Sequence, residues 1–117
     1  MENNYFDRIN AVLDEQKWIE EFLIGQGYCV ICGHDDPLDL EGHHPGRERN
    51  HTWFRISVCR NCHGRFTRRQ DRWWPKESLR SDNPPDLKIA FVHRGLAEAF
   101  EAKARRIFDA HGVSWYQ

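Results

Sequence analysis

Three segments between residues 29 and 63 decide the fold: Cys29-Val-Ile-Cys32, then His43-His44, then Cys59-Arg-Asn-Cys62-His63. Each CxxC pair places two thiolates on one tight turn, and two such turns supply the corners of a tetrahedral zinc site with bonds of about 2.3 Å. The 26 residues between the pairs (33–58) exceed the roughly 15–20 of a minimal zinc ribbon, which predicts an insert between the two turns. The insert carries two histidines that a four-cysteine site does not need. We therefore predict a structural zinc site and a separate histidine site beside it.

The length and composition predict one domain over residues 1–117, with a modest core that gains stability from a bound metal. A hydrophobic fraction of 39% and a charged fraction of 30% are typical of a soluble globular protein. No apolar run approaches the ~20 residues that cross a bilayer, and residues 1–7 lack the basic start of a signal peptide. We expect a reducing cytoplasm, where two matched CxxC pairs indicate metal binding rather than a disulfide or a thioredoxin-like redox site.

The net charge is only −1, but acidic and basic residues are concentrated in different parts of the chain. Residues 43–80 hold ten basic and three acidic side chains, a local excess of seven positive charges around the histidines. Nine of the ten bases are arginine, which favours bidentate contacts with phosphate over a merely solvated surface. The pattern therefore predicts a nucleic-acid partner for this part of the chain.

Hydrophobic periodicity predicts an α+β fold with a helix at each end. We expect a helix over 4–24, a short strand around 38–41, a second strand over 53–58 and a basic helix over 63–72. Residues 73–85 have the composition of a linker, in which Trp73 and Trp74 either cover a core edge or stack on nucleobases. A last helix is expected over 86–111, capped by Asn83, with an apolar side formed by Ile89, Val92, Leu96, Ala99, Phe100 and Ile107.

The two CxxC pairs, the histidine doublet and the CxxCH end together resemble the HNH nucleases, a family with a ββα-metal fold. The resemblance covers about residues 28–72 and is greatest with bacterial and phage members that carry a zinc-ribbon clamp. It implies a small ββα-metal core stapled by a structural zinc on Cys29, Cys32, Cys59 and Cys62. His34 directly follows the first pair and is the alternative zinc ligand.

The resemblance also implies a role for each histidine of the insert. His43 and His63 match the family's ligands for a catalytic divalent metal (Mg²⁺, Mn²⁺, Ni²⁺ or Zn²⁺), and His44 matches its general base. Asn50 matches the asparagine that orients the base, with Asn61 and His51 as alternatives. Many members place another histidine or asparagine one helical turn after the CxxCH histidine. Here that position is Thr67, which could bind a metal only through a water.

Strand geometry supports different roles for the two adjacent histidines, one as metal ligand and the other as general base. Neighbouring side chains on a strand point to opposite faces, so His43 and His44 cannot both bind one metal in regular β geometry. One imidazole coordinates, and the other is free to take a proton from water, for which an ordinary pKa near 6.5 is suited. Backbone phosphates would then be held by arginines, for which we predict Arg47, Arg49, Arg65, Arg68 and Arg69.

These features predict a metal-dependent endonuclease that hydrolyses DNA phosphodiester bonds, with RNA a less favoured substrate. Two alternatives are a zinc-ribbon module that binds nucleic acid without cutting, and a structural zinc domain whose arginines meet an acidic protein. The partner expected is DNA and not a membrane, and the assemblies considered are a homodimer and a larger nucleic-acid-processing complex. By the resemblance the source is prokaryotic or phage.

Overall fold

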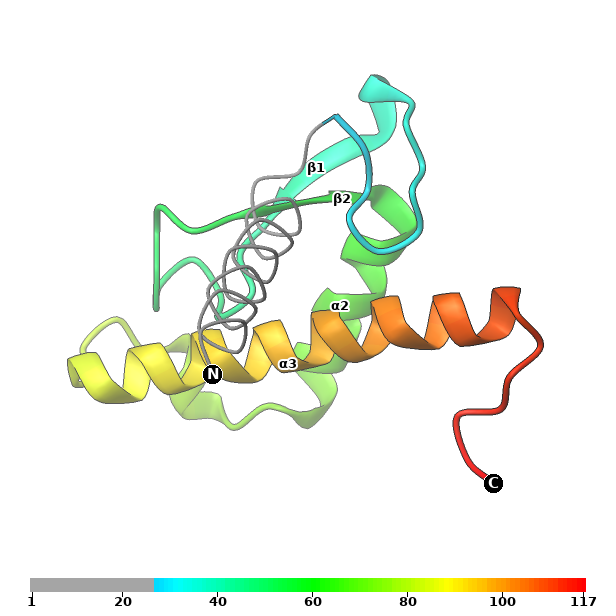
Figure 1. Ribbon diagram of the computed structural model, residues 1–117. Coiled ribbons are helices and arrows are strands. Elements are labelled where there is room, and N and C mark those ends of the chain that lie inside the picture. The colour runs from blue at the N-terminus through cyan, green and yellow to red at the C-terminus, as the bar shows by residue number, and fades with distance from the viewer. Residues whose placement is uncertain (1–26) are drawn as a thin grey trace, which may run out of the picture.

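The computed structural model describes residues 27–117, and the helix predicted over 4–24 lies outside the described residues. The described part has a short hairpin, two α-helices and two 3₁₀ turns (Figure 1). In chain order the elements are η1 (Pro37–Asp39), β1 (Leu40–His43), β2 (Ile56–Cys59), α2 (Arg60–Trp73), η2 (Lys76–Leu79) and α3 (Pro85–Ala110). This mixture of a two-stranded antiparallel sheet and helices confirms the predicted α+β class.

The hairpin pairs β1 with β2 in antiparallel register, with Leu40 opposite Cys59 and His43 opposite Ile56. The first strand was predicted around 38–41 but begins only at Leu40. Pro37 starts a 3₁₀ turn before it, and the Asp36 carboxylate accepts the Leu38 N–H in that turn. The strand predicted over 53–58 begins only at Ile56, and Trp53 is 89% exposed in the connecting loop. His43 is therefore the last residue of β1, and Cys59 is the last residue of β2.

Helix α2 starts at Arg60 rather than at His63, so the second CxxC pair is not a separate turn before the helix. Cys59 is its N-cap, and Cys62 and His63 belong to its first turn. The helix buries Cys62, Phe66 and Gln70, which are spaced one turn apart and define a single face. The opposite face is polar and carries most of the arginines of the segment.

Three residues of the segment 74–84, which was expected as part of a linker, are buried in the fold: Trp74, Ser78 and Asn83. Trp74 is 7% exposed and stacks on Phe91 with ring centroids 5.7 Å apart, so it covers a core edge. Asn83 does not cap α3, which has Pro84 as its N-cap. The Asn83 amide is buried and donates instead to the Glu77 carbonyl at 2.6 Å, because the η2 turn presents that oxygen to it.

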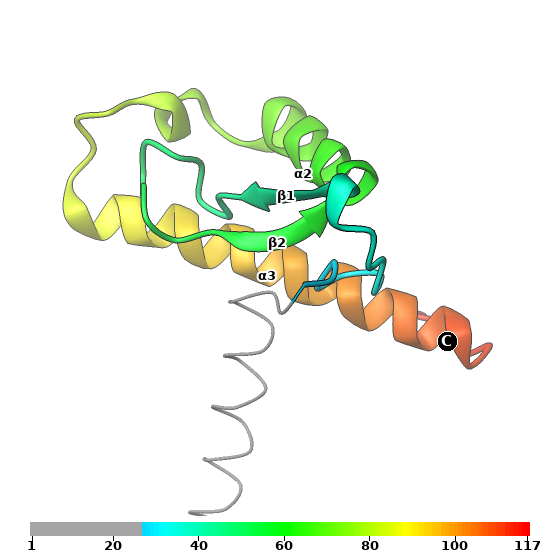
Figure 2. The ribbon, with the colours of Figure 1, turned by 90° about the horizontal axis from the view of Figure 1, so that it is seen from above.

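Helix α3 runs beside the hairpin and α2, and its C-terminal end extends past them (Figures 1 and 2). It buries Phe91, Gly95 and Ala99, one turn apart, with Leu96 and Phe100 partly buried beside them. Two residues of the predicted apolar side, Ile89 and Ile107, are each 50% exposed because the buried stripe is centred on Phe91 and Ala99. No helix within residues 27–117 has the length and apolar character needed to span a membrane.

The core is one cluster that joins the first CxxC turn, β2, α2 and α3. It contains Cys29, Val30, Ile31, Ile56, Val58, Cys59, Cys62, Phe66 and Ala99. Three of the four cysteines belong to this cluster, so the predicted zinc site is part of the core rather than an appendage to it.

Candidate metal centre and histidine site

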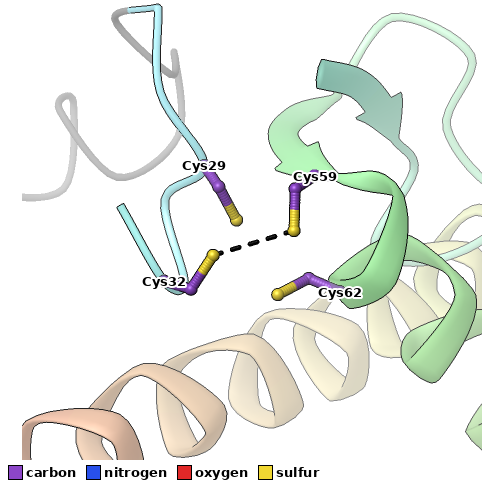
Figure 3. A group of neighbouring side chains, drawn as sticks. All are labelled: Cys29, Cys32, Cys59 and Cys62. Carbon is purple, nitrogen blue, oxygen red and sulfur yellow. Dashed lines mark hydrogen bonds between the residues drawn. The ribbon is translucent and has the colours of Figure 1, made fainter. Parts of the chain in front are cut away.

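The four cysteines come together from three elements, with their sulfurs pointing toward one another (Figure 3). The first CxxC turn is closed by hydrogen bonds from the Gly33 N–H to the Cys29 carbonyl and from the Cys29 N–H to the His34 carbonyl. Gly33 has φ of +80°, which glycine adopts without strain. Cys59 ends β2 and Cys62 lies one turn later on α2, so the hairpin and helix fix the other two sulfurs.

The donor set fits a structural metal such as zinc. All four sulfurs lie within 4.8 Å of one another, and the Cys32 and Cys59 sulfurs are 3.7 Å apart. A tetrahedral zinc with bonds of about 2.3 Å requires sulfur separations of about 3.8 Å, close to that distance. His34 is not part of this set, because its Nε2 pairs with the Asp39 carboxylate at 2.8 Å.

The cysteine pKa values are mutually dependent. A hydrogen bond from Cys62 lowers the pKa of Cys29, while the same bond and burial raise the pKa of Cys62. Burial also raises the pKa of Cys32. A buried cluster of four cysteines stabilises one deprotonated thiolate, but several thiolates repel one another. Deprotonation of all four therefore requires a bound cation that compensates their charge.

His43 and His63 lie beside each other at the junction of β1 and α2. Their ring centroids are 5.3 Å apart in an edge-to-face arrangement, and the His43 ring stacks on Phe66 at 5.1 Å. His43 is only 3% exposed. Burial, followed by the neighbouring His63 and His44, lowers the pKa of His43 to about 4. The His43 imidazole is therefore neutral at neutral pH and has a lone pair available for a metal.

Glu41 is the residue of this site that the sequence analysis missed. Its Oε2 lies 2.5 Å from Nδ1 of His63, and its Oε1 lies 3.6 Å from Nε of Arg60. Glu41 stands two residues before His43, so both side chains lie on the same face of β1. The alternation of the strand was the signal that could have found it. A carboxylate bonded to one ring nitrogen fixes the orientation of the imidazole and increases its basicity toward a metal.

His44 follows β1 and does not share the environment of His43. Its Nε2 lies 3.1 Å from the backbone carbonyl oxygen of Thr52, in the loop that leads back to β2. When Nε2 donates to that carbonyl, Nδ1 is the nitrogen left to accept a proton. Thr52 itself is anchored through its hydroxyl to the Glu48 carbonyl at 3.5 Å.

Asn50 is buried, and its side chain bonds to Gly46, Ser78 and Asn83 rather than to His44. Its Nδ2 donates to the carbonyls of Gly46, at 2.6 Å, and of Ser78, at 3.0 Å. It thereby holds the loop after His44 against η2. The two alternatives to Asn50 lie elsewhere: Asn61 is exposed on α2, and His51 accepts the Phe54 N–H at 3.0 Å.

The five predicted phosphate-binding arginines fall into different environments. Arg47 donates to Ser78 Oγ at 2.9 Å and to Asp71 at 3.2 Å, and Arg49 donates to the Leu79 carbonyl at 2.7 Å. These two tie the loop to η2 and α2. Arg65 and Arg69 line a cleft between α2 and α3, and Arg68 is exposed. Their contacts with phosphate remain a prediction. Thr67 is exposed one turn after His63, as the helix register requires.

Comparisons of the chain with protein-family models, with curated proteins and with solved structures found no match. The resemblance of the motifs to HNH nucleases therefore stays a prediction, and the function is argued from the site itself.

Proposed function

We propose that this protein is a metal-dependent endonuclease of the HNH type, with a ββα-metal core, that hydrolyses phosphodiester bonds in DNA. The observation that carries the proposal is the arrangement of three histidines. His43 and His63 meet across the β1–α2 junction with centroids 5.3 Å apart, while the adjacent His44 is held separately by the Thr52 carbonyl. Two adjacent imidazoles beside a third, independently oriented one match a metal site with its own general base.

In this proposal His43 and His63 hold a divalent ion, which when bound neutralises charge on the scissile phosphate and on the leaving oxygen. Glu41 keeps the His63 ring oriented through the contact at Nδ1. The lowered pKa of His43 keeps its lone pair free of a proton in the whole neutral range. Phe66, stacked on His43, restricts the ring to the orientation in which it faces His63.

His44 is the proposed general base, which takes a proton from the attacking water at Nδ1. The bond from Nε2–H to the Thr52 carbonyl selects the tautomer with Nδ1 unprotonated and stabilises the imidazolium formed after proton transfer. Asn50 is a positioning residue in this mechanism. It holds the loop that carries His44, through the Gly46 and Ser78 carbonyls.

A second function, nucleic-acid binding without cleavage, is favoured by one observation. Thr67 occupies the helical position where a further ligand would face the same metal as His63, and a threonine hydroxyl is a weak ligand. The proposed catalytic site thus has two strong protein donors, His43 and His63, because the Glu41 carboxylate is engaged with His63 Nδ1 and Arg60. An enzyme of this kind needs water or substrate oxygens to complete the coordination of its metal.

A plasmid-nicking assay tests the function directly. Wild-type protein with added Mg²⁺, Mn²⁺, Ni²⁺ or Zn²⁺ is expected to convert supercoiled DNA to open-circle or linear forms. His44→Ala should lose this activity while still binding DNA, and His93→Ala, an exposed histidine on α3, should keep it. Failure of the wild type to cut with every metal, with DNA binding retained, would establish the binding module instead.

A further inference from the structure

Two arginine pairs from different helices face a common cleft between α2 and α3. The cleft has a volume of about 220 Å³ and is lined by Arg65 and Arg69 of α2 and by Arg105 and Arg106 of α3. Ile31, Cys62, Phe66 and Ala102 supply its apolar floor. Arg65 and Arg69 are one turn apart on α2 and point away from the side that carries His63. The cleft is therefore separate from the histidine site.

Three of these four guanidinium groups have no side-chain partner in the part of the chain that the structure describes. Within residues 27–117, Arg65, Arg69 and Arg106 make no hydrogen bond or ion pair with another side chain. Arg105 is different, because it pairs with Glu101 at 3.1 Å and stacks over Trp115 at 4.5 Å. One acid, Asp109, lines the cleft. Like charges gathered in this way repel one another and are stabilised by an anion that bridges them.

A second cleft of about 370 Å³ continues the first around the start of α2. The two share Arg65 and Arg106, and the second adds Arg60 and Asn61. Its one acid, Asp39, is already paired with His34. Arg60 in turn lies 3.6 Å from Glu41, which contacts His63. The basic groups thus form a row from the α2–α3 cleft to the edge of the histidine site.

The neighbouring cysteine site accounts for only part of this charge. A zinc bound by four thiolates carries two net negative charges, and the two clefts are lined by Cys62 on one side and by Cys32 and Cys59 on the other. Five arginines in the row, Arg60, Arg65, Arg69, Arg105 and Arg106, bring five positive charges. Glu41 and Glu101 already pair with Arg60 and Arg105. The three remaining positive charges match the formal charge of a zinc site and Asp109. The case for a further ligand therefore rests on the guanidinium N–H groups of Arg65, Arg69 and Arg106, which lack a side-chain partner within residues 27–117.

We propose that the two clefts form one binding track for successive phosphates of a nucleic-acid strand, at a distance from the cleaved bond. The proposal rests on the proposed function for the class of partner but not for cleavage. Guanidinium groups bind phosphate oxygens in bidentate geometry, and a half-open row of them suits a polymer backbone better than a single buried anion. The strand would lie along Arg69, Arg65 and Arg60 and approach the histidine site past Glu41.

Binding of a fluorescein-labelled DNA duplex, followed by anisotropy over a series of salt concentrations, tests the track. Arg65→Gln and Arg106→Gln are the key variants because these residues line both clefts. Each is expected to raise Kd about 5- to 10-fold and to reduce the slope of log Kd against log salt by about 1, the effect of one lost phosphate contact. Arg72→Gln is the matched control, since it removes one exposed charge from the same helix outside both clefts.

Equal effects of Arg65→Gln, Arg106→Gln and Arg72→Gln would overturn the proposal. So would displacement of the duplex by inorganic phosphate at an equal concentration of phosphate groups, which would indicate a single-anion pocket. If Arg65→Gln does not fold, Arg69→Gln replaces it as the α2 variant, with its folding checked by circular dichroism. Hydrolysis of bis(p-nitrophenyl) phosphate, which is too small to reach the track, is measured in parallel. If the wild type hydrolyses neither this substrate nor plasmid DNA with Mg²⁺, Mn²⁺, Ni²⁺ or Zn²⁺, the nuclease is refuted and the binding result stands.

Discussion

Gly95 of α3 lies against the backbone carbonyl of Pro45, with no space for a side chain between them. A Cβ built on Gly95 would overlap the Pro45 carbonyl oxygen and carbon. The same carbonyl accepts a hydrogen bond from the Gln70 amide of α2 at 3.0 Å. Nearby, a Cβ on Gly46 would come within 2.7 Å of the Val92 backbone nitrogen. Both long helices therefore clamp the turn that directly follows His44.

We expect Gly95→Ala to destabilise the protein by at least about 2 kcal/mol, although alanine is the better helix former by about 1 kcal/mol. The added methyl group must push α3 away from Pro45, so DNA cleavage should also fall. Gly64→Ala on α2 is the matched control, because its new Cβ would meet only the flexible end of Arg68 at 3.1 Å. That change should be neutral or stabilising by about 0.5–1 kcal/mol. Chemical denaturation measures both, and equal stabilities would contradict the close contact.

Glu41→Gln is expected to weaken the proposed catalytic metal site without unfolding the protein. Loss of the carboxylate leaves the His63 ring less firmly oriented, and partners of this kind typically contribute about 10- to 100-fold in metal affinity or activity. The concentration of Mn²⁺ needed for half-maximal cleavage should rise by such a factor. Glu48→Gln, an exposed residue of the loop, should leave that concentration unchanged. A wild-type metal dependence in Glu41→Gln would show that Glu41 acts only structurally.

The four-cysteine site predicts one tightly bound zinc per chain, measurable by elemental analysis. Cys62→Ser should lose the zinc and the cooperative unfolding transition, because the zinc ligands are part of the core. Asn61→Ser changes an exposed residue between two ligands and should keep both. Zinc affinity should fall as pH falls, since the pKa values of Cys32 and Cys62 are raised and their protons must leave on binding. Full zinc content in Cys62→Ser would refute the assignment.

Acidification should destabilise the protein through His43, whose pKa is lowered from 6.5 to about 4 by burial. Above pH 6.5 the imidazole is neutral in both the folded and the unfolded chain, so its contribution to stability is complete. Between these two values the unfolded chain binds a proton that the folded chain does not. Stability is therefore lost as pH falls through this window, by about 3 kcal/mol in total.

The measurement is the difference in unfolding free energy between wild type and His43→Gln from pH 7 to pH 4, without added divalent metal. This difference isolates His43 from the acid sensitivity of the cysteine site. It should change steadily between pH 6.5 and pH 4. A difference that does not vary with pH would mean that His43 titrates normally in the folded protein.

The sequence by itself determined the parts of this protein that depend on local spacing. The spacing within each CxxC pair brings two sulfurs close together, and helical periodicity places Thr67 one turn after His63. Each follows from backbone geometry over a few residues. Element boundaries were less accurate: β1 starts two residues later than predicted because of the 3₁₀ turn at Pro37, and α2 starts three residues earlier because Cys59 is its N-cap.

The tertiary structure alone decided which distant groups meet. Glu41 reaches His63 because the hairpin and α2 fold together at the cysteine site, and Gly95 reaches Pro45 because α3 returns across the loop. Arg105 and Arg106 join Arg65 and Arg69 in the same way. These contacts depend on how whole elements pack around one core, and packing is set by shape and burial over the entire chain rather than by the spacing of neighbouring residues.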